Sequence, residues 1–162
     1  MSTFYLPEGV TSRSATLEDV DIAAELFKIN ALATDGGEDI NAEETRSSWQ
    51  SPGFNPATDI HLVFTNGGRL AAYVEVWANS KLPVHPFVWG CVHPDLYGKG
   101  LGMYITAWGE ERCRQLIDIL PVDLRLAAHA VAISTNQPAH QLLKDMNWIY
   151  IRSFYTMRID MV

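Results

Sequence analysis

Residues 92–102 read VHPDLYGKGLG, and this stretch decides the fold of the chain. The residues before it, 87–91 (FVWGC), are β-branched, aromatic or small, which is typical of a buried strand. Pro94 ends that strand because a proline cannot donate to a sheet ladder. After the glycines, Leu101, Ile105 and Trp108 recur with helical spacing. The glycines therefore lie where a strand turns into a helix.

A glycine-rich turn between a strand and a helix favours the binding of an anion. The first N–H groups of a helix have no partner within the helix, and the helix dipole adds partial positive charge there. Glycines let the backbone approach a phosphate closely, and Lys99 adds a full charge. We therefore expect a phosphorylated ligand here, with a plain glycine-rich turn as the alternative.

Two common phosphate motifs do not fit this stretch. A Walker loop needs Ser or Thr after Gly-Lys, but Gly100 follows Lys99. A dinucleotide fingerprint, Gly-x-Gly-x-x-Gly, would need a glycine at Met103 or Ile105. Neither a P-loop nor a dinucleotide site is indicated.

The stretch resembles motif A of the GNAT superfamily, the acyl-CoA-dependent N-acyltransferases. That motif has the pattern Gln/Arg-x-x-Gly-x-Gly/Ala and holds the pyrophosphate of coenzyme A. Tyr97 stands where the family usually has Gln or Arg. A second family motif is similar to residues 136–148, where Asn136, Ala139, Leu142 and Leu143 match and Asn-Trp replaces the usual Gly-Phe.

The order of the expected elements also resembles the GNAT fold over nearly the full chain. Apolar periodicity, caps and breakers predict helices near residues 20–33, at 42–49 after Asn41, from 101 to about 116 and at 136–146. They predict strands at 10–14, 60–64, 69–78, 87–91, 122–133 and 148–161, with a hairpin turn at Asn66-Gly67. The expected fold class is one mixed α/β domain over residues 1–162. Its mostly antiparallel sheet is flanked by helices and splayed at the cofactor site.

Bulk composition narrows the function classes. The chain has 162 residues, about half apolar, and a net charge of −7. Residues 1–44 hold ten acidic and two basic residues, the reverse of a basic nucleic-acid surface. No apolar run is long enough to span a membrane, and the first residues lack the pattern of a signal peptide. Cys91 and Cys113 match no metal spacing. We expect a cytoplasmic protein without nucleic-acid, membrane or metal partners, and a homodimer is left open.

The resemblance implies acetyl-CoA as co-substrate and assigns the residues that hold it. The pantetheine arm would pair with the backbone of Gly90, Cys91 and Val92, as a ligand added to a strand. Asn136 would contact the arm from the other side. The remaining cofactor-binding candidates form the turn and the helix start: Tyr97, Gly98, Lys99, Gly100, Leu101, Gly102 and Met103.

The transfer chemistry needs a base for the amine and an acid for the departing thiolate. Glu75 and His129 are the candidate bases; an exposed sheet-face carboxylate and a hydrogen-bonded core histidine are the alternatives. Many family members carry a Tyr where this chain has Leu143. Either another group such as Tyr104 or Tyr150 supplies the proton, or the thiolate leaves unassisted.

In such folds the first two helices and their loop build the acceptor pocket. We therefore expect Asp35, Glu38 and Asp39 to attract a cationic small-molecule or peptide amine, with a solvated acidic face as the alternative. The predicted function is transfer of an acetyl group to a primary amine by direct attack. The competing functions are a non-catalytic acyl-CoA sensor and a transferase of longer acyl groups.

Overall fold

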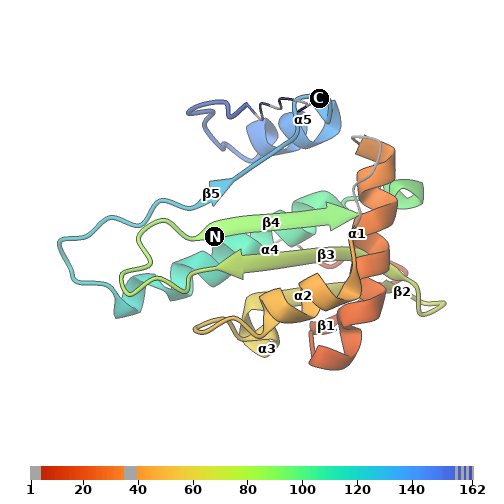
Figure 1. The fold of residues 1–162 in the computed structure, drawn as a ribbon, viewed down its shortest axis with the longest axis horizontal. Helices are drawn as coiled ribbons and strands as arrows, with labels where there is room; N and C mark the ends of the chain where they lie inside the picture. Colours follow the sequence, from red (N-terminus) through yellow and green to blue (C-terminus); the bar gives the residue numbers. More distant parts are fainter. Residues whose placement is uncertain (1–4, 35–39, 156, 158, 160, 162) are drawn as a thin grey trace.

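The computed structural model describes residues 5–34, 40–155, 157, 159 and 161, and within them the chain forms one mixed sheet between helices (Figure 1). The strands are β1 (Val10–Ser14), β2 (Ile60–Thr65), β3 (Leu70–Trp77), β4 (Phe87–Val92) and β5 (His129–Ala130). The helices are α1 (Val20–Thr34), α2 (Ala42–Trp49), α3 (Pro56–Asp59), α4 (Leu101–Gln115) and α5 (Gln137–Asp145). Short 3-10 turns lie at Leu17–Asp19, Pro94–Leu96 and Ile117–Ile119.

The strands follow one another in the sheet in chain order, β1-β2-β3-β4-β5. Each of the first four is antiparallel to its neighbour, whereas β5 runs parallel to β4. A parallel pair needs a crossover, and α4 supplies it. The expected mixed, mostly antiparallel GNAT-like sheet is confirmed.

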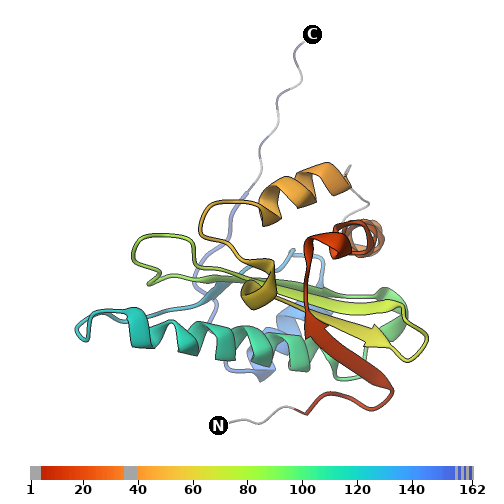
Figure 2. The ribbon, with the colours of Figure 1, turned by 90° about the horizontal axis from the view of Figure 1, so that it is seen from below.

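The helices cover both faces of the sheet, as Figure 2 shows: α1 and α2 lie above it and α4 below it. The core on the α1 side includes Trp49 and Tyr73, and the core on the α4 side includes Val74, Val88 and Ile105. Alternation along β3 explains this division, because successive side chains point to opposite faces. Every second residue of β3 from Tyr73 therefore faces α1 and α2.

Local sequence signals account for most of these elements. The hairpin of β2 and β3 forms as predicted, and the left-handed residue of its turn is Gly68, with φ of 81°. Asn41 caps α2 by accepting a 2.8 Å hydrogen bond from the N–H of Glu44. The helix α3 was not predicted, although Asn55 caps it and Pro56 begins it, a favourable pair at a helix start.

The predicted strand over 122–133 is wrong except for β5. The segment does run beside the chain that leads into β4, because Ala127 N–H donates to Val84 O and His129 N–H donates to Pro86 O. Pro86 has no N–H to return a bond, so a regular ladder does not extend there. The strand is reduced to His129 and Ala130.

The predicted strand over 148–161 is also wrong for the described residues, none of which is in a strand there. Trp148 is half-buried, and the large apolar side chains after it, among them Ile149, Ile151 and Met157, are 65% to 91% exposed. Alternating apolar residues form a strand only when a neighbouring edge pairs with them. Because β5 has only two residues, its free edge is too short to pair with this segment.

Candidate functional site

A cavity of about 490 Å³ opens where β4 and β5 separate. The two strands pair at Phe87–His129 and Val88–Ala130 and then diverge. Gly90, Cys91 and Val92 form one wall, and the walls opposite come from the chain after β5 and from α5. The other edge of β4 is paired with β3, so the edge toward the cavity remains for a ligand. The splayed sheet that the sequence predicted is present.

The glycine-rich turn closes one end of this cavity. Gly98 and Gly100 have φ of 75° and 79°, left-handed values that residues with a Cβ rarely adopt. Gly100 is the N-cap of α4, so the first amides of that helix lie beside the cavity. Gly102 faces α5, where a Cβ would come within 2.9 Å of Leu142 Cδ2. The glycines thus set the turn and the approach of α5.

The structure brings together all but one of the residues that the resemblance assigned to the cofactor. Lys99 is exposed and does not line the cavity. The residues that do line it are Gly90, Cys91, Val92, Tyr97, Gly98, Gly100, Leu101, Gly102, Met103 and Asn136. The side-chain oxygen of Asn136 already caps α5, accepting from Ala139 N–H at 3.2 Å, which leaves its NH₂ group for a ligand.

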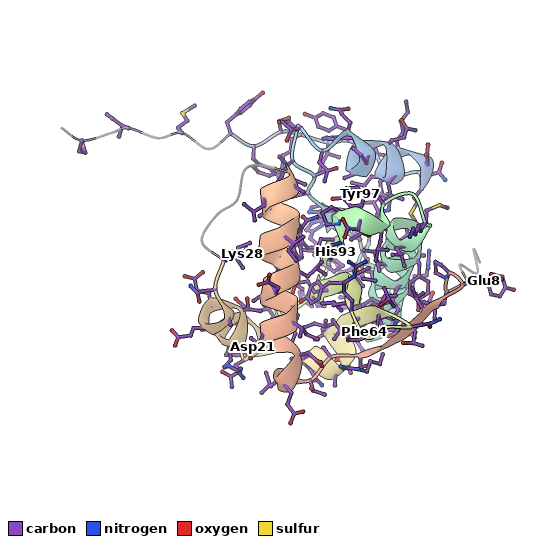
Figure 3. All side chains as sticks on the ribbon, turned by 90° about the vertical axis from the view of Figure 1, so that its right-hand side faces the viewer. Glu8, Asp21, Lys28, Phe64, His93 and Tyr97 are labelled. Atoms are coloured by element: carbon purple, nitrogen blue, oxygen red, sulfur yellow. The ribbon has the colours of Figure 1, made fainter. Side chains whose placement is uncertain are left out.

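Sequence reasoning missed Asn30, which ties α1 to this cavity. Its Nδ2 lies 3.3 Å from the Tyr97 hydroxyl and 3.4 Å from Val92 O. Tyr97 lies on the sheet side of α1, as does His93, while Lys28 points away from the sheet (Figure 3). Asn30 is a polar residue on an otherwise apolar face of α1. This was the one feature of the sequence that could have identified it.

A second cavity of about 390 Å³ lies on the other side of β4, between the sheet and helices α1 and α2. Trp89 lines both cavities. The pairing of Glu75 with Trp89 across β3 and β4 places Glu75 on the same face, and Glu75 lines the second cavity. Two ligands, one in each cavity, would therefore approach each other at Trp89.

Glu75 has the environment of a general base. The Tyr73 hydroxyl donates a 2.6 Å hydrogen bond to its Oε2. Burial raises the pKa of the Glu75 carboxyl, and the hydrogen bond from Tyr73 opposes that rise. A carboxyl with a raised pKa takes protons closer to neutral pH than an ordinary glutamate does.

The other candidate base, His129, lies apart from both cavities. It pairs with Phe87 in the sheet, and its ring stacks on that of His85 at a centroid distance of 4.9 Å. His129 lines neither of the two cavities. The acceptor candidates Asp35, Glu38 and Asp39 lie outside the described residues.

The candidate proton donors for the thiolate are also distant. The hydroxyl of Tyr104 lies 3.1 Å from His61 Nε2, and Tyr150 is exposed. Neither lines the cavity beside the glycine-rich turn, and Leu143 lines that cavity without a proton to donate. Cys91 is buried, and burial raises the pKa of its thiol far above the usual value, which disfavours the thiolate.

Among the described residues, no group of three or more His, Cys, Asp or Glu side chains is placed to hold a metal ion. In the same part of the chain, no helix is long and apolar enough to cross a membrane.

Known structures resemble this fold. A GCN5-related N-acetyltransferase from Sphaerobacter thermophilus superposes with a TM-score of 0.80 and 28% identity; the match covers 88% of this chain and 44% of that one. This chain thus spans less than half the length of that protein. The yncA protein from Salmonella typhimurium, solved with its cofactor acetyl-CoA, gives a TM-score of 0.66 and 16% identity, over 86% of this chain and 79% of that one.

An acetyltransferase of the GNAT family from Streptococcus pneumoniae gives a TM-score of 0.64 and 18% identity, over 85% of this chain and 83% of that one. No family sequence model matches the chain, and no curated protein sequence matches it. The fold of this chain is therefore the one seen in N-acetyltransferases of the GNAT family, and its glycine-rich turn resembles motif A of that family.

Proposed function

We propose that this protein transfers an acetyl group from acetyl-CoA to a primary amine, which attacks the thioester directly. The observation that carries the proposal is the shared wall at Trp89. On one side of it lies the cavity with the glycine-rich turn, and on the other lies the cavity with Glu75. Two substrates bound in these cavities would approach each other across β4.

Backbone groups account for the binding of the co-substrate. Acetyl-CoA supplies an activated acyl group as a thioester. The amides at the start of α4, after Gly100, are suited to the pyrophosphate because they carry positive partial charge without a partner in the helix. The free edge of β4 at Gly90–Val92 is suited to the amides of the pantetheine arm. An N–H of the same edge would also stabilise the oxyanion.

Glu75 is proposed to take the proton that the amine must lose. Free amines with a pKa near 10 are mostly protonated at pH 7, and only the neutral form is a nucleophile. The neutral nitrogen then attacks the carbonyl carbon, the C–S bond breaks, coenzyme A leaves as a thiolate, and the nitrogen releases its second proton to solvent to give the amide. A thiol pKa of about 8.5 makes an unassisted thiolate an adequate leaving group, which fits the absence of a donor at Leu143.

Leu143 is also the observation that favours the alternative of an acyl-CoA sensor without turnover. The two functions differ in one measurable product, the free thiol of coenzyme A. Calorimetric titration with acetyl-CoA, followed by thiol release in the presence of amines, therefore tests the proposal. Binding together with amine-dependent release is expected, and binding without release from any amine would contradict transfer.

Gly100 offers a matched pair of variants for the binding step. Gly100→Glu and Gly100→Gln carry the same backbone strain at φ of 79°, and they differ in charge. We expect Gly100→Glu to bind acetyl-CoA at least about tenfold more weakly than Gly100→Gln does, because a like charge beside the pyrophosphate costs about 1–2 kcal/mol. Equal losses would contradict a phosphate site in the turn.

A further inference from the structure

We infer that the second cavity selects a monoamine whose ammonium group is carried on a flat aromatic body, rather than a polyamine or a sugar with several amines. The inference rests on the proposed function, because it names the acceptor for the same transfer. It narrows the broad expectation of a cationic amine that the acidic N-terminal region gave.

Aromatic side chains form the largest apolar part of the cavity lining. Five aromatic side chains from α1, α2, β3 and β4 surround it: Phe27, Trp49, Trp77, Phe87 and Trp89. The volume of about 390 Å³ lies near the lower end of the range for small-molecule sites, roughly 300–1,000 Å³. The polar lining residues Asn41, Glu44, Thr45 and Ser48 all belong to α2 and its N-cap, on one side of the cavity. The aromatic walls bury a flat apolar ligand well and offer hydroxyl and amine groups no partner there.

The aromatic walls are braced by further aromatic contacts. Trp77 stacks on Phe54 at a centroid distance of 4.0 Å and an interplanar angle of 13°. Phe27 meets Trp89 edge to face at 5.0 Å. Trp49 is buried and stacks on Tyr73 at 6.1 Å. These contacts hold the rings before any ligand arrives, so ordering the site costs little on binding.

The charges of the lining fit one ammonium group in the interior. Glu75 is the inner carboxylate, and Glu44 is exposed on α2 at the rim. No lysine or arginine occurs among the described lining residues. A single ammonium can pair with Glu75 and lie against the ring faces, a favourable cation–π arrangement. A second or third ammonium inside would be buried without a partner, which is costly.

The position of Glu75 also orients such a ligand. Because Glu75 pairs with Trp89 in the sheet, the ammonium at Glu75 lies next to the wall shared with the coenzyme A cavity. The aromatic body then extends toward Trp77 and Phe87, further from the thioester. The reactive nitrogen therefore lies nearer to the thioester than the ring does.

The test compares amines that differ in one property each. Thiol release from acetyl-CoA is measured with 2-phenylethylamine, 2-cyclohexylethylamine, spermidine and kanamycin. We expect kcat/KM for 2-phenylethylamine to exceed that for spermidine and kanamycin by at least about tenfold, since its ring stacks on the aromatic walls while its single ammonium pairs with Glu75. 2-Cyclohexylethylamine should fall between them.

A pair of variants ties the preference to the cavity. Trp77→Phe retains an aromatic wall and Trp77→Leu removes it, while neither changes the coenzyme A cavity. The preference for the phenyl over the cyclohexyl amine should persist in Trp77→Phe and shrink about threefold or more in Trp77→Leu. Thermal unfolding and acetyl-CoA titration of both variants confirm that they are folded.

The outcomes separate this inference from the proposed function. Release with spermidine or kanamycin as the best acceptor would overturn the inference and leave acetyl transfer standing. If no amine releases thiol, calorimetric titration of the same four amines in the presence of coenzyme A still decides. Tightest binding of 2-phenylethylamine supports the aromatic-amine site, and equal or weaker binding than spermidine overturns it.

Discussion

The hydroxyl of Tyr73 donates a 2.6 Å hydrogen bond to Oε2 of Glu75, two residues further along β3. Both side chains lie on the sheet face covered by α1 and α2, and Tyr73 is completely buried. Burial raises the pKa of both groups, and the bond favours the ionised form of Glu75. The phenol therefore limits how far the pKa of this carboxyl rises.

Removing the phenol should move the acid limb of the pH profile upward. In Tyr73→Phe the carboxylate loses one of its hydrogen-bond donors, so the pKa of Glu75 rises further. The acid limb of kcat/KM should therefore shift to higher pH. Glu75→Gln should lose the limb together with about 10²–10⁴ in rate. An unshifted limb in Tyr73→Phe would assign the base to another group.

Glu75→Gln should also stabilise the fold toward neutral pH. The folded pKa of Glu75 is raised above the ordinary value of 4.5, so the folded state binds the proton more tightly than the unfolded state. Stability contributed by this group is present below pH 4.5 and is lost as pH rises through the folded pKa. Glutamine carries no charge to bury. The melting temperature of Glu75→Gln, relative to the natural protein, should therefore rise from pH 4 to pH 7.

Removing one partner of the buried ion pair between α4 and α3 should be strongly destabilising. Arg112 Nε and Nη2 donate to Asp59 Oδ1 at 3.0 and 2.8 Å, and Asp59 is 6% exposed. Arg112→Leu leaves a buried carboxylate without its cation, which costs about 3–5 kcal/mol of unfolding free energy. Arg114→Leu is the control. Arg114 forms exposed ion pairs with Glu110 and Glu111, and exposed pairs contribute about 0–1 kcal/mol. Urea unfolding measures the free energy of unfolding of both variants, and equal losses in the two would contradict this prediction.

The sequence predicted what depends on local chemistry. Caps, glycines and periodicity located α1, α2, α4 and α5 because each signal acts within a few residues. The glycine-rich turn located the cavity between β4 and α5 for the same reason, since Gly98 and Gly100 determine the backbone at its end.

The errors concern pairing between distant segments. Alternation in 122–133 and 148–161 indicates an ability to form a strand, but a ladder also needs a partner with free N–H and C=O groups. Pro86 removes one of those groups beside β5, a fact visible only once the two segments are adjacent. Asn30 was missed because its contact with Val92 spans 62 positions.

Gly109 should be required for the close packing of α4 on β4. A Cβ at this position would lie 2.6 Å from Val88 Cγ1, and valine has little rotamer freedom to yield. Overpacking costs about 1–3 kcal/mol, against about 1 kcal/mol gained from the helix propensity of alanine. Gly109→Ala should therefore lower the melting temperature, and adding Val88→Ala should recover part of the loss. A double variant less stable than Gly109→Ala would show that the contact is not the cause.

Lys99 should contribute to acetyl-CoA binding through its field rather than by a direct contact. Its side chain is exposed and does not line the cavity, although the two glycines beside it do. Exposed charges act over about 10 Å at 0.1 M salt and over about 3 Å at 1 M salt. Lys99→Gln should therefore weaken acetyl-CoA binding about threefold at low salt and leave it unchanged at 1 M salt. Gly100→Glu places its charge in the turn itself, so more of its effect should survive at high salt. Calorimetric titration at the two salt concentrations separates these cases, and a large loss in Lys99→Gln at 1 M salt would mean that this lysine pairs with the pyrophosphate directly.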